Sequence, residues 1–450
     1  MTAGRDAETA LSARTLISYG LPAAALAIPT IPVYVQLPSF YAAEVGLGLT
    51  AIGVALFAAR LLDVVTDPLV GLLCDARPTR FGRRKPWIAA GAVLGGISMM
   101  QLFAPPAGAG VAHLFAWAAL LYLGWTLVAI PYAAWGAELS ADYHQRARVT
   151  SVREGAGLLG ILLAGALLAA GPPLGLAATA TQSAVGWAAI LLGAPSLAWL
   201  LWRVPEARGA GAGGAPIPLR ALAGGLWRNR PFLRLVGAWF LNGVANGLPA
   251  ALFPLYVGHG LQLDDRFAGG LIFTYFASGI AAIPLWLMLS RRVGKQRAWC
   301  AAMLLCCAAF AWVPWLPPGA WPAFLLVCLV TGAALGADLA LPPALQADVV
   351  DYDAWRFGRP RAGLLFALWS MATKLALAAA VGIAFPALDW AGFDAAAPAN
   401  PPGAILTLTV IYALVPIVIK LITVTMVWTH PLTSRRHSAI RSRLARRATA

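Results

Sequence analysis

Long apolar runs recur along the whole sequence, and they constrain the fold more than any other feature. Hydrophobic residues make up 60% of the 450-residue chain, and charged residues only 11%. A helix of about 20 apolar residues crosses the roughly 30 Å hydrocarbon core of a bilayer, and it satisfies its backbone hydrogen bonds internally. The sequence therefore predicts an all-α membrane protein with twelve transmembrane helices, at approximately 15–41, 49–74, 87–104, 111–138, 151–171, 183–203, 231–257, 267–290, 298–316, 321–347, 362–388 and 404–428.

Basic residues are distributed unevenly between the predicted connections. Of the 33 Lys and Arg residues, 29 lie in the two tails or in the even-numbered connections, at 75–86, 142–153, 203–234, 291–297 and 356–361. Such an excess marks the cytoplasmic loops of membrane proteins. We therefore expect both termini to be cytoplasmic in an inner or plasma membrane, and we do not interpret the net charge of +15 as a nucleic-acid-binding surface.

The chain divides into two halves that resemble each other weakly. A basic connection follows the second predicted helix of each half, GRRKPW at 82–87 and SRRVGKQRAW at 290–299. A stretch rich in Gly, Ala and Pro separates the halves and is typical of a flexible linker. The predicted domains are pseudo-symmetric six-helix bundles at 1–204 and 231–430, a cytoplasmic linker at 205–230 and a basic cytoplasmic tail at 431–450. Two such bundles suit alternating access.

The second predicted helix carries three charged residues on one face. Arg60, Asp63 and Asp67 are spaced by three and four residues among Leu, Val and Ala. Charges at mid-membrane depth are costly, so this stripe indicates a functional site. The alternative is an Arg60–Asp63 pair that only fastens helices together. Thr126, in the fourth predicted helix, has a hydroxyl that could ligate a hard cation or bond to its own helix.

Lys374 lies deep in the eleventh predicted helix. It is twelve residues past the cytoplasmic start of its span, and Asp63 is twelve residues before the cytoplasmic end of its own. At 1.5 Å rise per residue, both lie roughly 18 Å from that face. Equal depth makes pairing with Asp63 possible. An unpaired lysine at this depth would be expected to lose its proton, so a carboxylate partner or a coupling ion is the simplest account.

Other polar residues in or near the helices are candidates for solute binding or for gating. Asn242 and Asn246 lie one turn apart, and Asp338 is an intramembrane carboxylate that requires an explanation. The expected substrate-binding residues are Trp125, Arg153, Asn242, Asn246 and Asp338. The expected gate or charge network comprises Arg60, Asp75, Arg83, Glu138, Asp351, Asp353 and Arg361. Packing or anchoring is the alternative role for these residues.

Several separated motifs resemble those of the glycoside–pentoside–hexuronide:cation symporters, the melibiose permease group of the major facilitator superfamily. They are SYG at 18–20, RLLDVVTDP at 60–68, GRRKPW at 82–87, QADVVDYD at 346–353 and Lys374. The resemblance implies the major facilitator fold and a coupling site for Na⁺, Li⁺ or H⁺ at Asp63, Asp67 and Thr126. It also matches Lys374 to a helix-11 lysine and Arg153 to an arginine implicated in sugar binding.

Two departures from the family pattern lie at positions that bind the sugar. Ala27 and Ala129 stand where the melibiose permease has acids that hold sugar hydroxyls. The cation site therefore carries over better than the substrate site, and Asp338 is a candidate replacement acid.

These patterns together predict a secondary transporter that couples H⁺ or Na⁺ entry to symport of a small polar solute, a sugar or glycoside. The expected partners are that solute, a monovalent cation and the lipid bilayer, with no cofactor beyond the ion and a monomeric state. No metal-ligand spacing or nucleophile–base set indicates an enzyme. The alternatives are a proton-coupled exporter or exchanger of an amphipathic compound, and a non-transporting sensor on a transporter scaffold.

The charge distribution predicts that the 203–234 connection is cytoplasmic. A single cysteine placed at Ala212 in a cysteine-free variant should react with an impermeant maleimide only after the membrane is made permeable. Labelling from the exterior of intact cells would overturn the topology.

Overall fold

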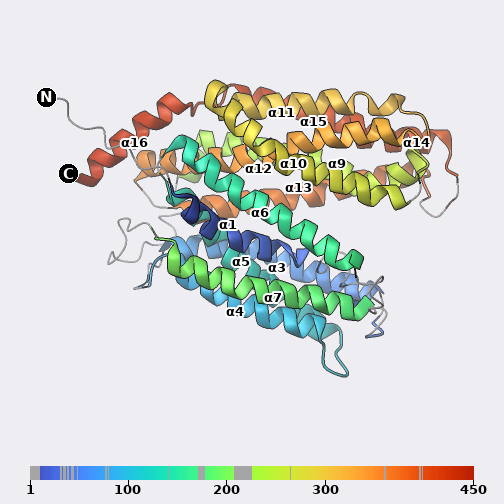
Figure 1. Cartoon of the computed structure of the whole chain (residues 1–450), viewed down its shortest axis with the longest axis horizontal. Helices are drawn as coiled ribbons and strands as arrows, with labels where there is room; N and C mark the ends of the chain where they lie inside the picture. Colours follow the sequence, from blue (N-terminus) through green and yellow to red (C-terminus); the bar gives the residue numbers. More distant parts are fainter. Residues whose placement is uncertain are drawn as a thin grey trace. The chain divides into compact units, whose positions relative to one another are not determined.

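The computed structural model contains helices and no β-strand among the residues that it describes (Figure 1). These are residues 11–449 apart from 31–32, 34–36, 38–39, 42–44, 48, 77–78, 80, 141, 171–177, 207–224, 264, 359–360, 395–396 and 398. The chain separates into two compact units. Unit 1 comprises residues 1–224, 353–367 and 447–450, and unit 2 comprises residues 225–352 and 368–446.

Unit 1 is a bundle built from the first half of the chain. Its helices are α1 (Ala13–Ala27), α3 (Leu49–Ala76), α4 (Lys85–Phe103), α5 (Val111–Glu138), α6 (Tyr143–Ala170) and α7 (Ala178–Arg203). Helix α5 packs against α3 and α4, and α1 packs against α6 and α7. Two clusters of buried apolar side chains form its core. The contact with α3 matters most, because it sets the position of the charged stripe.

Unit 2 is built from the second half of the chain. Its elements are α9 (Arg230–Leu255), the π-helix η4 (Tyr256–Gly260), α10 (Asp265–Val293), α11 (Lys295–Phe310), α12 (Trp321–Phe357), α13 (Ala362–Trp390), α14 (Pro402–Thr409), the π-helix η6 (Val410–Leu414), α15 (Val415–Trp428) and α16 (Ser434–Thr449). The last residues of α12 and the first of α13 count with unit 1. Helix α15 packs against α9 and α11. The predicted basic tail is largely the helix α16, and most of the predicted linker lies outside the described residues.

Ten helical segments within the described residues are long and apolar enough to cross a bilayer. They match the ten predicted spans from 87–104 to 404–428. The other two predicted spans correspond to α1, a regular helix of 15 residues, and α3, whose 28 residues include four charged ones. The prediction of an all-helical membrane protein is confirmed.

Two helix ends differ from the predicted spans for identifiable reasons. Helix α12 continues to Phe357, well past the predicted end at 347, and stops before Gly358, whose φ of 65° is the left-handed conformation that ends many helices. Apolar patterning reports membrane depth, whereas a helix can continue into water. Helix α1 ends at Ala27, two residues before Pro29, although the apolar run extends further.

Helices α4 and α5 approach each other through glycines. A Cβ added at Gly124 would lie 2.7 Å from the backbone nitrogen of Gly95, and one added at Gly91 would lie 2.7 Å from the Gly124 carbonyl oxygen. Both distances are shorter than atoms can approach without a backbone shift. Small residues allow such close contact between membrane helices, where dispersion contacts replace the hydrophobic effect as the driving force.

We expect Gly124→Ala to destabilise the protein by about 1–3 kcal/mol, because the two helix backbones must separate. Gly96→Ala is the matched control, since a Cβ there meets no atom within 4 Å. It should be neutral or slightly stabilising through helix propensity. Thermal unfolding in detergent, followed by circular dichroism, measures both changes. Equal midpoints for the two variants would contradict the close-packing argument.

Candidate functional site

Two acidic side chains of α3 meet a threonine of α5 inside unit 1. Asp63 and Asp67 lie one helical turn apart and are buried, with 4% and 1% of their surfaces exposed. The Thr126 hydroxyl oxygen lies 2.9 Å from Oδ1 of Asp63 and 2.7 Å from Oδ1 of Asp67. The direct packing of α3 against α5 thus brings together the three residues that the resemblance grouped.

The geometry of this cluster favours the binding of one additional positive charge. A hydroxyl has a single hydrogen, so Thr126 donates to only one of the two carboxylates at a time. Two ionised carboxylates that share a site also repel each other. A proton on one acid, or a small cation bound by the three oxygens, would relieve both problems. Carboxylate and hydroxyl oxygens are hard ligands, as alkali and alkaline-earth ions prefer.

Arg60 only partly supplies that positive charge. Its Nη1 lies 3.4 Å from Oδ2 of Asp63, and 36% of its side chain is exposed. The guanidinium also lies over the Tyr122 ring, 4.8 Å from the ring centre. Long, partly exposed ion pairs contribute little. The ion pair between Arg60 and Asp63 is therefore a weak one.

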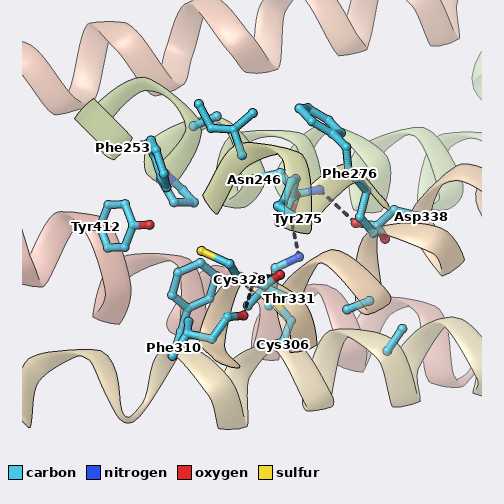
Figure 2. A pocket seen from close by; sticks show the side chains of 18 of the residues that line it. Asn246, Phe253, Tyr275, Phe276, Cys306, Phe310, Cys328, Thr331, Asp338 and Tyr412 are labelled. Atoms are coloured by element: carbon cyan, nitrogen blue, oxygen red, sulfur yellow. Dashed lines mark hydrogen bonds between the residues drawn. The ribbon is translucent and has the colours of Figure 1, made fainter. Parts of the chain in front are cut away.

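Unit 2 contains a second polar group, which links four helices; Figure 2 shows the contact between two of its members, Asn246 and Asp338. Lys420 on α15 donates to the side-chain oxygens of Asn242 and Asn246 on α9, at 2.8 Å each. The Asn246 amide nitrogen donates to Oδ2 of Asp338 on α12 at 2.8 Å. The Trp299 indole of α11 donates to the other carboxylate oxygen at 2.6 Å. We call these residues the unit 2 polar chain.

Asn242, Asn246 and Asp338 are apparent as candidates from the sequence, but the other two members of the unit 2 polar chain, Lys420 and Trp299, are not. Lys420 lies in an apolar helix with no charged neighbour in sequence, although an intramembrane lysine is itself a signal. Trp299 follows a basic connection and resembles an interfacial anchor. Lys420 is 2% exposed and Trp299 fully buried, so both depend on the partners that the fold supplies.

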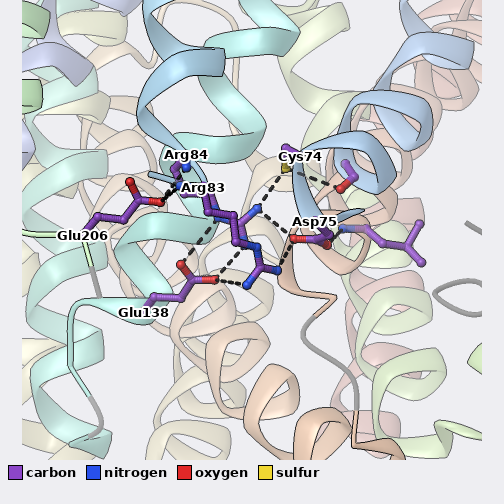
Figure 3. A network of polar contacts seen from close by, with 8 residues as sticks. Cys74, Asp75, Arg83, Arg84, Glu138 and Glu206 are labelled. Carbon is purple, nitrogen blue, oxygen red and sulfur yellow. Dashed lines mark hydrogen bonds and ion pairs between the residues drawn. The ribbon is translucent and has the colours of Figure 1, made fainter. Parts of the chain in front are cut away.

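A third polar group surrounds the start of α4 in unit 1 (Figure 3). The Asp75 carboxylate contacts Arg83 at 2.6 Å and Arg84 at 2.8 Å, and Arg84 reaches Glu138 at 2.7 Å. The other oxygen of Asp75 accepts a hydrogen bond from the backbone nitrogen of Leu364, at the start of α13. Asp75, Arg83 and Glu138 thus lie together, within the expected charge network.

Two residues of this group, Arg84 and Glu206, are not predicted from the sequence. Arg84 is completely buried, and it bridges Asp75 and Glu138. Burial alone would lower the pKa of its guanidinium, but the adjacent acids raise that pKa well above its ordinary value. Glu206 accepts hydrogen bonds from the backbone nitrogens of Arg83 and Arg84, at 2.6 and 2.5 Å. A carboxylate at a helix N-terminus is favoured by the helix dipole.

The acids at the end of α12 are also paired. Arg361 forms a two-pronged ion pair with Asp353 at 2.5 and 2.7 Å, buried within unit 1. Asp351 contacts His437 at 2.8 Å and Arg441 at 3.4 Å on α16 in unit 2. The basic composition of the tail does not predict these partners on α16.

The positions of the remaining candidates indicate less about their roles. Arg153 pairs with its neighbour Glu154 on α6, and Trp125 is half-buried on α5 beside Thr126 in sequence. Lys374 is half-buried on α13 in unit 2, whereas Asp63 belongs to unit 1. The pairing of Lys374 with Asp63 therefore stays a prediction. Within the described residues, no group of three or more His, Cys, Asp or Glu side chains could hold a metal ion.

Comparison with known proteins gives matches that cover nearly the whole chain. Residues 18–434 match the family model for MFS/sugar transport proteins. The chain is 25% identical over 443 residues to a glucuronide carrier protein homolog of Escherichia coli, covering 96% of this chain and 95% of that protein. It is 26% identical over 470 residues to the putative glycoside/cation symporter YagG of the same organism, covering 97% and 95%.

A solved structure supports the fold independently. The proton:xylose symporter XylE of the major facilitator superfamily matches with a TM-score of 0.65 at 16% identity, covering 95% of this chain and 98% of that one. The family match and the relatives also identify the class of protein, which is a transporter and not an enzyme. The chain therefore belongs to the MFS/sugar transport protein family and is an integral membrane transporter with the major facilitator fold.

Proposed function

We propose that this transporter is a symporter that couples entry of H⁺ or Na⁺ to uptake of a small polar solute, a sugar or a glycoside. The coupling ion binds at Asp63, Asp67 and Thr126. The observation that carries the proposal is the single hydroxyl hydrogen shared between two buried carboxylates. The names of the two relatives, a glucuronide carrier homolog and a putative glycoside/cation symporter, support a carbohydrate solute.

The proposed coupling follows from charge. An ion can shift a conformational equilibrium only if it binds the two states with different affinity. With the site empty, the two carboxylates repel each other in a buried location. With a proton or Na⁺ bound, the cluster loses that repulsion, and the change in access of an alternating-access transporter becomes less costly. Arg153, Trp125, Asn242, Asn246 and Asp338 are the candidate solute contacts.

We further propose that the protein lies in the inner membrane with both termini in the cytoplasm. The concentration of 29 of the 33 basic residues in the tails and even-numbered connections supports this orientation. The proposed working unit is a monomer whose only accessory ligand is the coupling ion.

Uptake into proteoliposomes tests the function. Labelled glucuronides, pentoses and hexoses are offered under an imposed Na⁺ gradient or pH gradient, and ionophores then collapse each gradient. We expect at least one solute to accumulate only while one gradient is present. Accumulation that survives the loss of both gradients would contradict cation coupling. Complete lack of flux for all solutes would favour the non-transporting alternative.

The Asp67→Asn variant should lose accumulation against a gradient while keeping its fold, because the amide has nearly the shape of the acid but no charge for the cation. Asp389→Asn makes the same change at an exposed position and should accumulate solute like the parent. Uptake by both variants is measured with the solute identified above, and circular dichroism checks the fold. If Asp67→Asn concentrates solute as well as the parent does, Asp67 is not an essential coupling carboxylate.

A further inference from the structure

A cavity of about 250 Å³ lies inside unit 2, whereas the residues of the proposed coupling site belong to unit 1. It is bounded by α9, α10, α11 and α12, with Tyr412 of η6 and Lys420 of α15 completing the wall. Every residue that lines it belongs to unit 2. The cavity is slightly smaller than most sites for drug-sized ligands, which span roughly 300–1,000 Å³.

The cavity wall is polarised from one end to the other. Figure 2 shows Asn246 and Asp338 towards one end, and Phe253 and Tyr412 towards the opposite end. The apolar part of the lining consists mainly of aromatic, aliphatic and sulfur-containing side chains, including Phe253, Phe276, Met303, Cys306, Phe310, Leu335 and Tyr412. A few polar groups converging on an otherwise apolar cavity are typical of a small-molecule site.

The polar end has hydrogen-bonding capacity to spare. An ammonium group has three donors, and Lys420 uses two of them on Asn242 and Asn246. Each oxygen of Asp338 accepts one hydrogen bond, from Asn246 or from Trp299, and has a further lone pair. A ligand at this end thus meets a donor and an acceptor together.

The charges at the polar end also restrict the net charge of a ligand that can bind there. Lys420 and Asp338 cancel each other when both are ionised, so a charged ligand would add an unbalanced buried charge, which is costly. A purely apolar ligand would leave the spare donor and acceptor unused. A neutral hydroxyl group can accept from Lys420 and donate to Asp338 at once.

We propose that the cavity of unit 2 binds a small neutral molecule with an apolar ring and a single hydroxyl group, with the hydroxyl between Lys420 and Asp338. The aromatic side chains pack against the ring. The site shares Asn246 and Asp338 with the candidate solute contacts, but Asp63, Asp67 and Thr126 do not line it, so its test does not require cation coupling.

Cysteine protection tests this site with 2-naphthol as the probe. Cys306 and Cys328 line the cavity, whereas Cys74 is buried in α3 of unit 1. Purified protein at pH 7, without any gradient, is treated with methyl methanethiolsulfonate, and modification of each cysteine is followed by mass spectrometry. At ten times its Kd, 2-naphthol should slow modification of Cys306 and Cys328 about tenfold by mass action and leave Cys74 unchanged.

Two other ligands serve as chemical controls. Naphthalene has the same ring without the hydroxyl, and 2-naphthoate has a negative charge in its place. Each should protect at least about tenfold more weakly at equal free concentration. Equal protection by naphthalene would overturn the hydroxyl contact. Lack of protection by 2-naphthol up to its solubility limit would overturn the site itself.

Variants separate the polar end from the apolar wall. Ala250→Phe narrows the cavity from an exposed position that lines it and should abolish protection, whereas Ile422→Phe adds the same ring at an exposed position outside the lining and should preserve it. Asp338→Asn should weaken protection about tenfold. If that variant does not fold, Ala250→Phe still decides the outcome, since retained protection would overturn the proposed site.

The Asp67→Asn variant distinguishes this proposal from the proposed transport function. It should bind 2-naphthol like the parent, even though it is expected to lose accumulation of solute. A parallel loss of cysteine protection in Asp67→Asn would contradict the independence of the two sites.

Discussion

An ionic group in a hydrocarbon environment must be solvated by other groups of the protein, because no water is present there. This constraint governs the buried polar groups of the two units. Bilayer lipid offers neither water nor a high dielectric constant, so a charged side chain is tolerated only where other parts of the protein replace the water. Two arrangements among the described residues illustrate this. Two carboxylates share one hydroxyl in unit 1, and an amide separates a lysine from an aspartate in unit 2. In the first, one hydroxyl hydrogen serves two carboxylates, which is why it is the proposed ion site.

The architecture and one of the clusters could be predicted from the sequence because they rest on local spacing. Apolar runs have the length of a membrane crossing, and Asp63 and Asp67 share a face whatever the helix packs against. Thr126 joined them through the family resemblance rather than through any spacing. Its position across the α3–α5 contact depends on tertiary packing, including the close approach of α5 to α4 at Gly124.

The partners in unit 2 could not be predicted, because they are distant in sequence. Lys420 and Asn246 are 174 residues apart, and Asn246 and Asp338 are 92 residues apart. The angular position of residues around the helix axis is a second reason why these partners could not be predicted. The π-helix η6 precedes α15 and contains more residues per turn than an α-helix, so a wheel with a constant step of about 100° misplaces every later residue. Residues before and after η6 therefore do not share the faces that a constant step would give them.

The Asn246 side chain has a consequence for how unit 2 moves. An amide has a donor end and an acceptor end; here the donor end binds the Asp338 carboxylate of α12, and the acceptor end binds the Lys420 ammonium of α15. A slide of α12 or α15 along α9 by a fraction of a turn would break one of these bonds and leave a buried charge short of a partner. The hydrogen bonds of Asn246 therefore oppose sliding of α12 and α15 along α9. The helices α9, α12 and α15 form a stiff frame, and motions of unit 2 during transport are expected to be those of a rigid body.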